Sequence, residues 1–325
     1  MSVNQHADPA RDPAPDRSLW PAYWRDAVKS NVLAEFGAAL SLGEGTTPRA
    51  SVIDDLRSYY GCSEDECIDE CVNWGRYFDA EWDAASSPAE FHRTTRSSSF
   101  SLLWAAYCQA EGYAWPGCVA TVEAVQRAGH FAGDHLDFAA GVGAMSQLFA
   151  RLGYRTTLAD ISTSMLEFAR FRLERRGTQA NYIDLNTERL PVGAYDVITA
   201  TDVLWLIPEP AETFRALHDA LKPNGVLFAN INPSTSKAAR WQVYDEDLPV
   251  RRQLQACGFE PLALSHCDIY RKVPATGPMH ACRLARDAML LGPVREIYRS
   301  ASASLNAYAA RRHAHTPRPL SLRHR

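Results

Sequence analysis

A short segment of the chain combines two acidic residues and a glycine turn at a spacing that suits cofactor binding. It reads Leu136-Asp-Phe-Ala-Ala-Gly-Val-Gly-Ala-Met145, and Asp160 follows at the end of the next apolar run. Glycine leaves no side chain in a turn, so backbone N–H groups at a helix N-terminus can approach a bound ligand. An acid at the end of the following strand can hold the hydroxyls of a ribose. The pattern predicts either a dinucleotide or an adenosyl cofactor.

The residues around the turn favour the adenosyl compound. A dinucleotide fingerprint needs a third glycine, G-x-G-x-x-G, where the helix packs on the strand. Residues 144–146, which follow Gly143, contain no glycine, so the fingerprint fails. Asp137 lies in the strand before the turn, where a carboxylate is badly placed beside a pyrophosphate. It is well placed to orient the ammonium group of an amino-acid cofactor.

Residues of about 120 to 275 resemble the class I S-adenosylmethionine (SAM) dependent methyltransferases. After the glycine turn, the family's signals continue in order with Asp184 in Tyr182-Ile-Asp-Leu185, the fourth-strand segment 195–204 and the turn 221–228 into the fifth strand. Ala139 departs from the family pattern, because it stands where the family usually has its first glycine. A methyl group is tolerable at that position.

The resemblance implies that SAM is the cofactor and that residues at the strand ends bind it. Asp137 and Thr201 would hold the methionine end, and Asp160 the ribose hydroxyls, with Ile161 flanking the adenine. Asp184 and the backbone after it would bind the adenine edge. The full set of cofactor-binding residues that the resemblance implies is Asp137, Ala139, Gly141, Gly143, Asp160, Ile161, Asp184, Leu185 and Thr201.

The residues after the fourth strand, 201–206 (the lip), carry the catalytic candidates. Methyl transfer is an in-line displacement, so the protein mainly aligns the nucleophile and removes its proton where needed. Many family members that act on small molecules carry an Asp-Val-Leu-Glu-His run at the lip, whereas this chain reads Asp202-Val-Leu-Trp-Leu206. Leu206 stands in place of the histidine, so Asp202 is the nearest ionisable candidate, with a helix cap as its alternative role.

Trp205, in the same run, has two interpretations. It either caps the core at a helix start, or it lines a pocket and stabilises a sulfonium or cationic substrate by a cation–π contact. In the second case it belongs to the catalytic site together with Asp202.

Three functions are compatible with these residues. The first is a methyltransferase for a small-molecule acceptor, in specialised metabolism. The second is a SAM-consuming cyclase, since azetidine-2-carboxylate synthases resemble this architecture and release methylthioadenosine when the cofactor's amine attacks its own γ-carbon. The third is a non-catalytic SAM-binding protein. A nucleic-acid or protein-amide methylase is disfavoured, because residues 201–204 do not read Asn/Asp-Pro-Pro-Tyr.

Strands that alternate with amphipathic helices predict an α/β fold: a seven-stranded, mostly parallel sheet flanked by helices, with a helical N-terminal subdomain. The last two strands are close in sequence and are expected to form an antiparallel hairpin. Strands are predicted near 134–139, 155–160, 180–184, 194–201, 225–232, 260–267 and 268–274, and helices near 144–152, 162–176, 209–221 and 246–257.

We expect four regions along the chain. Residues 1–17 are predicted to be disordered, and residues 18–127 to form a helical lid or substrate subdomain. The capping box Ser63-Glu-Asp-Glu66 marks one of its helix starts. Residues 128–276 are the expected SAM domain, and residues 277–325 a helical extension with a basic tail.

The charge and hydropathy of the chain limit the kinds of binding partner and the cellular location that we expect. A net charge of −4 argues against a surface that follows nucleic-acid phosphates. We find neither an apolar run of the roughly 18 residues that span a membrane nor a secretory signal, so we expect a cytoplasmic protein whose partner is a small molecule. The oligomeric state stays open, with a homodimer as one option.

The eight cysteines are expected to be reduced thiols in such a chain. Cys62, Cys67 and Cys71 match neither a paired C-x-x-C zinc pattern nor the motif of radical SAM enzymes. Cys67 and Cys71 share one helix face, which favours buried thiols. No metal is expected.

Overall fold

The computed structural model describes residues 8–10, 12, 15–20, 22–231, 243–263 and 268–285. The chain forms two compact units, Met1–Val273 and Pro274–Arg325. In the second unit, the described residues 278–285 are helical. The first unit holds the sheet and the helices before it, and the following description concerns that unit.

The first unit is built on a seven-stranded sheet of order β3-β2-β1-β4-β5-β7-β6. The strands β1 to β5 run parallel, and β7 pairs antiparallel with both β5 and β6. This confirms the predicted fold class, including the terminal hairpin. The strands are β1 (Asp134–Phe138), β2 (Arg155–Asp160), β3 (Asn181–Asp184), β4 (Tyr195–Thr201), β5 (Leu221–Asn230), β6 (Phe259–Ala263) and β7 (Asp268–Lys272).

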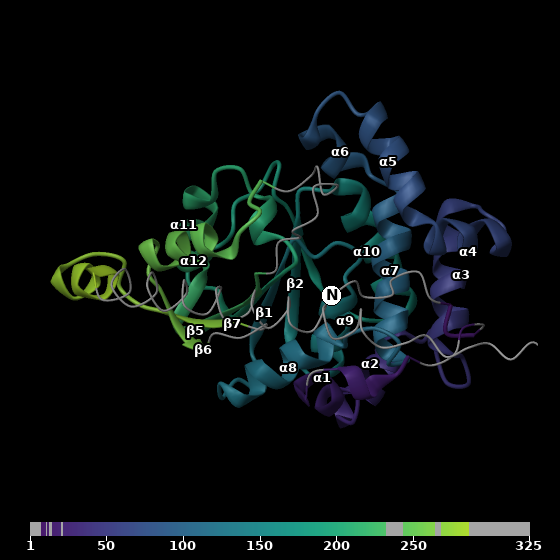
Figure 1. Cartoon of the computed structure of the whole chain (residues 1–325), viewed down its shortest axis with the longest axis horizontal. Coiled ribbons are helices and arrows are strands. Elements are labelled where there is room, and N and C mark those ends of the chain that lie inside the picture. Colours follow the sequence, from purple (N-terminus) through teal and green to yellow (C-terminus); the bar gives the residue numbers. More distant parts are fainter. Residues whose placement is uncertain are drawn as a thin grey trace, which may run out of the picture. The chain divides into compact units, whose positions relative to one another are not determined.

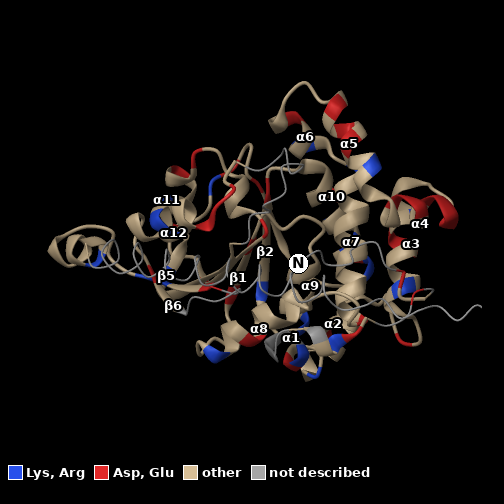
Figure 2. Ribbon diagram, in the orientation of Figure 1, with Lys and Arg blue, Asp and Glu red and all other residues tan. Residues whose placement is uncertain are grey.

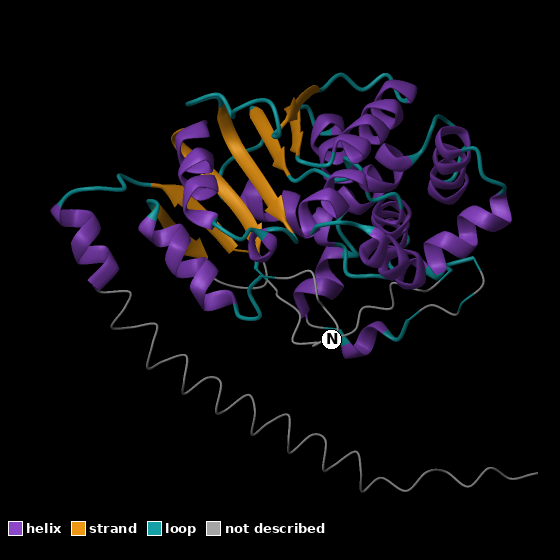
Figure 3. Ribbon diagram, turned by 90° about the horizontal axis from the view of Figure 1, so that it is seen from above, coloured by secondary structure: helices purple, strands orange, loops and turns teal. Residues whose placement is uncertain are grey.

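Helices cover both faces of the sheet (Figure 3). Because strand side chains alternate, Val226 and Phe228 face one side of β5, and Leu227 and Ala229 the other. Helices α8 (Gly117–Arg127) and α9 (Ala144–Arg151) pack on the first side, and α10 (Thr163–Arg175) packs on β2 and β3. Helices α11 (Pro210–Ala220) and α12 (Asp247–Ala256) share the core of the second side.

Among the described residues before α8, helices α1 to α7 form an additional layer outside α9 and α10 (Figure 1). Helix α2 contacts α8 and α9, whereas α3 and α6 contact α10. One buried cluster runs from these helices into the sheet, from Phe36 and Trp104 to Val197. The helices are α1 (Ala22–Ala27), α2 (Asn31–Leu40), α3 (Pro48–Tyr60), α4 (Glu64–Val72), α5 (Trp74–Ala84), α6 (Pro88–Thr94) and α7 (Ser97–Ala110).

One buried cluster contains residues from both sides of the predicted boundary at residue 127. The helices before this residue and the sheet after it lie in the same compact unit. A second buried cluster lies entirely after this residue, in the sheet and around helices α11 and α12. The boundary at residue 127 stays a prediction.

The helices and strands predicted from local sequence signals lie close to the observed ones, and one strand begins earlier than predicted. The predicted capping box is present, with Ser63 as N-cap and Glu66 bonded back to it. Strand β5 begins at Leu221 rather than at residue 225, because Leu221 already pairs with Tyr195 before the register shifts. Asn224, in the intervening bulge, has a positive φ of 66°. Residues 264–267 of the predicted strand 260–267 lie outside the described residues.

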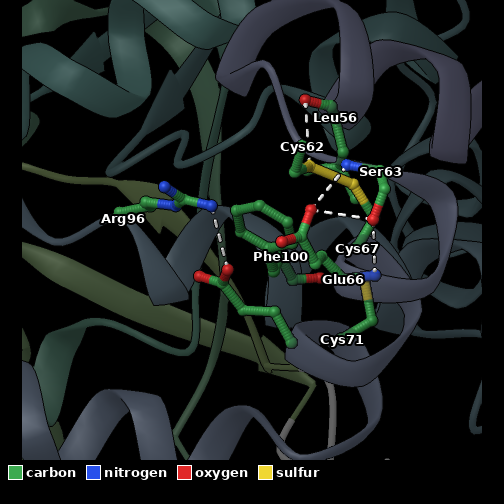
Figure 4. The surroundings of a disulfide bond; sticks show 9 residues. Leu56, Cys62, Ser63, Glu66, Cys67, Cys71, Arg96 and Phe100 are labelled. Carbon is green, nitrogen blue, oxygen red and sulfur yellow. Dashed lines mark hydrogen bonds and ion pairs between the residues drawn. A yellow bond between two sulfur atoms is a disulfide. The ribbon is translucent and has the colours of Figure 1, made fainter.

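The expectation of reduced thiols is wrong for two cysteines. Cys62 and Cys67 form a disulfide (Figure 4), with a Cα–Cα distance of 6.2 Å. Helix α3 ends at Gly61 in a left-handed conformation, and the turn into α4 brings the two residues together. Cys71 is a buried free thiol that donates to the carbonyl of Phe100 at 3.7 Å. The expected burial of Cys67 and Cys71 is confirmed.

Acidic residues are frequent along α4 and α5, which are coloured red at these positions in Figure 2. The first turn of α4 contributes Glu64, Asp65 and Glu66. Among the helices of the described residues, none combines the length and the apolar character that a bilayer crossing requires.

Candidate functional site

The predicted cofactor acids come together at the carboxyl edge of the parallel strands. Asp160 and Asp184 are direct partners at the ends of β2 and β3. Asp137, near the end of β1, pairs with Thr199 of β4. Because β1 lies between β2 and β4, strand order reverses here, and such a switch point opens a crevice for ligands.

The glycine turn, residues 139–143, is tied to β2. The N–H groups of Ala139 and Ala140 both donate to the carbonyl of Ala159, at 2.7 and 3.2 Å. The N–H of Gly141 donates to Asp160 Oδ2 at 2.8 Å. The acid expected at the ribose thus also holds the turn in place.

The two glycines of the turn face different surroundings. A Cβ on Gly143 would come within 2.9 Å of Leu158 and 3.2 Å of Ala169, so this residue must be glycine for α10 to pack. A Cβ on Gly141 would lie 3.0 Å from Leu102 of α7, a side chain that is 44% exposed. Gly141 therefore lies beneath Leu102, whereas Gly143 packs against β2 and α10.

Ala139 has a positive φ of 58°. This is the left-handed region, where a side chain other than glycine's costs roughly 1–2 kcal/mol. Ala139, which stands where the family usually has glycine, is therefore a strained residue at the start of the turn.

Asp137 is buried and points to the face of the sheet that α9 covers. Its Oδ2 accepts from the Ser146 N–H at 3.2 Å and from the Ser146 hydroxyl at 2.8 Å, and its Oδ1 accepts from the Thr199 hydroxyl at 3.1 Å. Burial raises the pKa of Asp137 to about 7, although these hydrogen bonds act in the opposite direction. A cation that approached the group would favour its ionised form.

His135, which the sequence analysis did not single out, contacts Asp137 indirectly through Thr199. Its Nε2 lies 2.9 Å from the Thr199 hydroxyl, and its ring stacks on the Phe149 ring with the centroids 3.8 Å apart. Since Thr199 donates to Asp137, we assign the proton to His135 Nε2. Burial lowers the pKa of His135 to about 3, so the ring stays neutral.

Asp160 and Ile161 combine a buried acid with an exposed apolar side chain. Besides Gly141, the Ser162 N–H donates to Asp160, at 2.8 Å. Burial raises the pKa of Asp160, and the backbone hydrogen bonds oppose this rise. Ile161 is 43% exposed, so its side chain is free to cover a flat ring.

Asp184 and the backbone at Leu185, which are predicted to bind the adenine edge, lie at the end of β3. Asp184 Oδ1 accepts from the Asn186 side chain at 2.6 Å, and the same amide donates to the Ile161 carbonyl at 2.8 Å. The Leu185 N–H donates to the Asp160 carbonyl at 3.0 Å. The pairing of β2 with β3 occupies this donor.

Asp202 follows Thr201 at the end of β4 and has a positive φ of 54°. Asn230, which pairs with Thr201 from β5, makes two hydrogen bonds to Asp202. The Asn230 side-chain oxygen accepts from the Asp202 N–H at 2.6 Å, and the Asn230 side-chain amide donates to Asp202 Oδ1 at 2.8 Å. The Asp202 side chain is exposed, yet surrounding protein atoms desolvate it and raise its pKa to about 6, with the Asn230 bond acting in the opposite direction.

Trp205 is only 7% exposed and packs in the core on the α11 and α12 side of the sheet. Its carbonyl accepts from the N–H groups of Val243 and Tyr244, both at 3.1 Å. This burial favours the first interpretation, a core residue at a helix start, over a pocket wall that contacts a cation.

Cys118 is a further residue near the lip. This half-buried thiol lies in the first turn of α8, and its N–H donates to the Gln109 side chain at 3.1 Å. Burial and the nearby charges of Asp137 and Asp202 raise its pKa. Nothing in the spacing of the sequence relates Cys118 to residues 137 and 202. Within the described ranges, no three His, Cys, Asp or Glu side chains are arranged to hold a metal ion.

Comparison with known proteins identifies similarity over the segment that contains the glycine turn and the strand-end acids. Residues 136–229 match the family model of the methyltransferase domain. The chain is 31% identical over 119 residues to a ubiquinone biosynthesis O-methyltransferase of Nitrosococcus oceani, which covers 36% of this chain and 50% of that protein. A protein of the same name from Shewanella pealeana is 34% identical over 108 residues, or 32% and 46% of the two chains. The chain thus spans about half the length of these relatives.

Two solved structures are among those that match parts of this chain. The 1,6-didemethyltoxoflavin-N1-methyltransferase of Burkholderia thailandensis is 18% identical, with a TM-score of 0.41 over 49% of this chain and 77% of that one. The [4+2]-cyclase SpnF is 22% identical, with a TM-score of 0.40 over 60% and 79%.

Proposed function

We propose, from the premise that residues 136–229 form a methyltransferase domain of the class I SAM-dependent family, that this chain transfers the methyl group of SAM to a small-molecule acceptor. The observation that carries the proposal is the alignment of Asp137, Asp160 and Asp184 along one edge of the sheet, beside the glycine turn. An acceptor from specialised metabolism and a cytoplasmic location are parts of the same proposal.

The residues of the site fit an adenosyl amino acid. Asp137 would bind its ammonium group together with Thr201, Asp160 would bind the ribose, and Ile161 would cover the adenine. When bound, SAM supplies an electrophilic methyl group on a sulfonium. The residue types fit these roles: Asp137 and Asp160 are buried carboxylates that would meet cationic and hydroxyl groups, and Ile161 is an exposed apolar side chain that would meet the ring.

Asp202 is the residue we propose as general base. With a pKa of about 6, it is a carboxylate at neutral pH and can accept a proton from an acceptor hydroxyl or amine. Asn230 holds Oδ1, and among the described residues none donates to Oδ2, which leaves that oxygen for the proton. Because Trp205 is buried, we assign it a supporting place in the core instead of a catalytic step.

The acceptor class to test first is a small molecule with a weakly acidic hydroxyl. The relatives named above are O-methyltransferases of ubiquinone biosynthesis, and an oxygen nucleophile suits the proposed base. Leu102 of α7, exposed above Gly141, offers an apolar surface for such a molecule.

Product analysis tests the proposal. The purified protein would be incubated with SAM alone and with a panel of phenols and amines, and the nucleosides separated by chromatography. We expect adenosylhomocysteine only when a suitable acceptor is present. Release of methylthioadenosine from SAM alone would contradict methyl transfer and support the cyclase. SAM binding without turnover across the panel would support a non-catalytic binding protein.

A further inference from the structure

A cluster of charged side chains lies between the N-terminal helices and the SAM domain, and two of its members are completely buried. Asp55 of α3 and Arg172 of α10 are both 0% exposed, and the Arg172 Nε donates to Asp55 Oδ2 at 3.1 Å. Helices α3 and α10 are in contact. A buried ion pair is expensive to desolvate, so its donors and acceptors must be well satisfied.

Arg172 joins three separate parts of the fold. Besides Asp55, its guanidinium donates to the carbonyl of Val142 in the glycine turn and, at 2.7 Å, to Gln147 of α9. The planar guanidinium reaches all three at once, which the single ammonium of lysine cannot do. The orientation of the Val142–Gly143 peptide is therefore coupled to α3.

Asp55 in turn is held by more than one cation. Arg175 donates to its Oδ1 at 2.8 Å, and Arg176 to its Oδ2 at 2.8 Å. Arg176 also donates to the carbonyl of Leu40, the last residue of α2, at 2.6 Å. One carboxylate thus gathers three guanidinium groups and connects α10 to two N-terminal helices.

We propose that Asp55 and Arg172 are positioning residues of the cofactor site: they hold the glycine turn in its binding conformation from the N-terminal helices. The inference rests on the proposed function, because it assigns the turn to SAM. Neither residue has to touch the ligand. Arg172 fixes the Val142 carbonyl, one residue after the Gly141 N–H, and Asp55 fixes Arg172. The N-terminal helices then contribute to cofactor affinity and do more than cover an acceptor.

The test measures binding of adenosylhomocysteine by calorimetry in the full chain. We expect Arg172→Lys, which keeps the charge but loses the three-way contact, to weaken binding about tenfold or more, with Asp55→Asn similar. The matched control is Leu56→Ala, which empties a buried position of the same helix without touching the cluster. It should lower the thermal midpoint comparably and leave affinity within about twofold. Equal affinity of Arg172→Lys and the wild type, or equal weakening by Leu56→Ala, would overturn the proposal.

Gln147→Ala provides a milder variant if the charged substitutions unfold the chain. It removes one of the three Arg172 partners but keeps the ion pair, and we expect a loss of binding of about two- to fivefold. A second readout is amide hydrogen exchange of residues 141–146 in the ligand-free protein. We expect this exchange to be faster in Gln147→Ala than in the wild type. Unchanged exchange and binding would overturn the inference. If the wild type binds no adenosylhomocysteine, the proposed function fails, whereas the exchange result still decides whether the cluster orders the turn.

Discussion

At the scale of single residues, the site contains strain that the fold tolerates. Ala139 and Asp202 both have a positive φ, and both follow a strand whose end belongs to the site. Such residues persist only where their surroundings determine their conformation. For Ala139 the surroundings are two hydrogen bonds to Ala159, and for Asp202 they are the two bonds to Asn230.

We predict that Ala139→Gly stabilises the protein. The substitution relieves roughly 1–2 kcal/mol of left-handed strain and increases the entropy of the unfolded chain by about 0.4–1 kcal/mol. The difference of these two terms lies between about 0 and 1.6 kcal/mol, so we expect a gain of roughly 0.8 kcal/mol in the free energy of unfolding, measured by urea denaturation. Ala140→Gly is the matched control, because Ala140 does not have a positive φ. A loss of stability in Ala139→Gly would contradict the strain.

A second residue-scale prediction concerns the pH dependence of the reaction. If Asp202 is the base, the rate rises as its carboxyl ionises, with a limb centred near pH 6 and a plateau above it. Asp202→Asn should lower the rate by roughly 10²–10⁴-fold and remove the limb, without changing the affinity for adenosylhomocysteine.

Asn230 allows a sharper test of the same assignment. Its hydrogen bond lowers the pKa of Asp202, so Asn230→Ala should shift the limb to higher pH. A pH profile that is the same in both proteins would mean that another group removes the proton.

At the scale of elements, the disulfide between Cys62 and Cys67 fastens the turn from α3 into α4. The bond closes a very short loop, for which the chain-entropy relation gives about 2 kcal/mol. We predict that Cys62→Ser lowers the free energy of unfolding by about that amount in the oxidised protein and has a much smaller effect after reduction. Peptide mapping after alkylation under non-reducing conditions should leave both cysteines unlabelled. Labelling of Cys62 would show that the pair is reduced.

The same turn explains why the bond escaped the sequence analysis. The spacing of Cys67 and Cys71 indicated a shared helix face, which is correct, but said nothing about Cys62. Its approach to Cys67 depends on the left-handed Gly61, which reverses the chain direction between two helices. Periodicity describes the interior of an element and not the path between elements.

At the scale of the whole molecule, the N-terminal helices and the sheet lie in one compact unit. One buried apolar cluster contains residues of both parts, and the buried Asp55–Arg172 pair joins them. We predict that a chain beginning at residue 128 does not fold on its own, because the outer faces of α9 and α10 lose their cover and Arg172 loses its counter-ion.

The measurement is the oligomeric state and the near-ultraviolet circular dichroism of that shortened chain, with the full chain as control. Aggregation or loss of the near-ultraviolet signal is the expected result. A monomeric, cooperatively unfolding fragment would show that the SAM domain is independent, as the boundary at residue 127 first suggested.

The sequence by itself determined the order of strands and helices and the acids at the strand ends. These features are local, because strand alternation, helix caps and a glycine turn depend on residues that are neighbours in the sequence. The parallel strands then place their carboxyl ends at one edge of the sheet. That is why Asp137, Asp160 and Asp184 could be named without a structure.

Only the tertiary structure decided which groups meet those residues. Asn230 reaches Asp202, Asp55 reaches Arg172, and the Leu185 N–H is taken by Asp160. Each of these contacts depends on how separate elements pack, and the distance along the chain carries no information about it. The strain at Ala139 and the buried place of Trp205 were decided in the same way, by neighbours that lie close in space and distant in sequence.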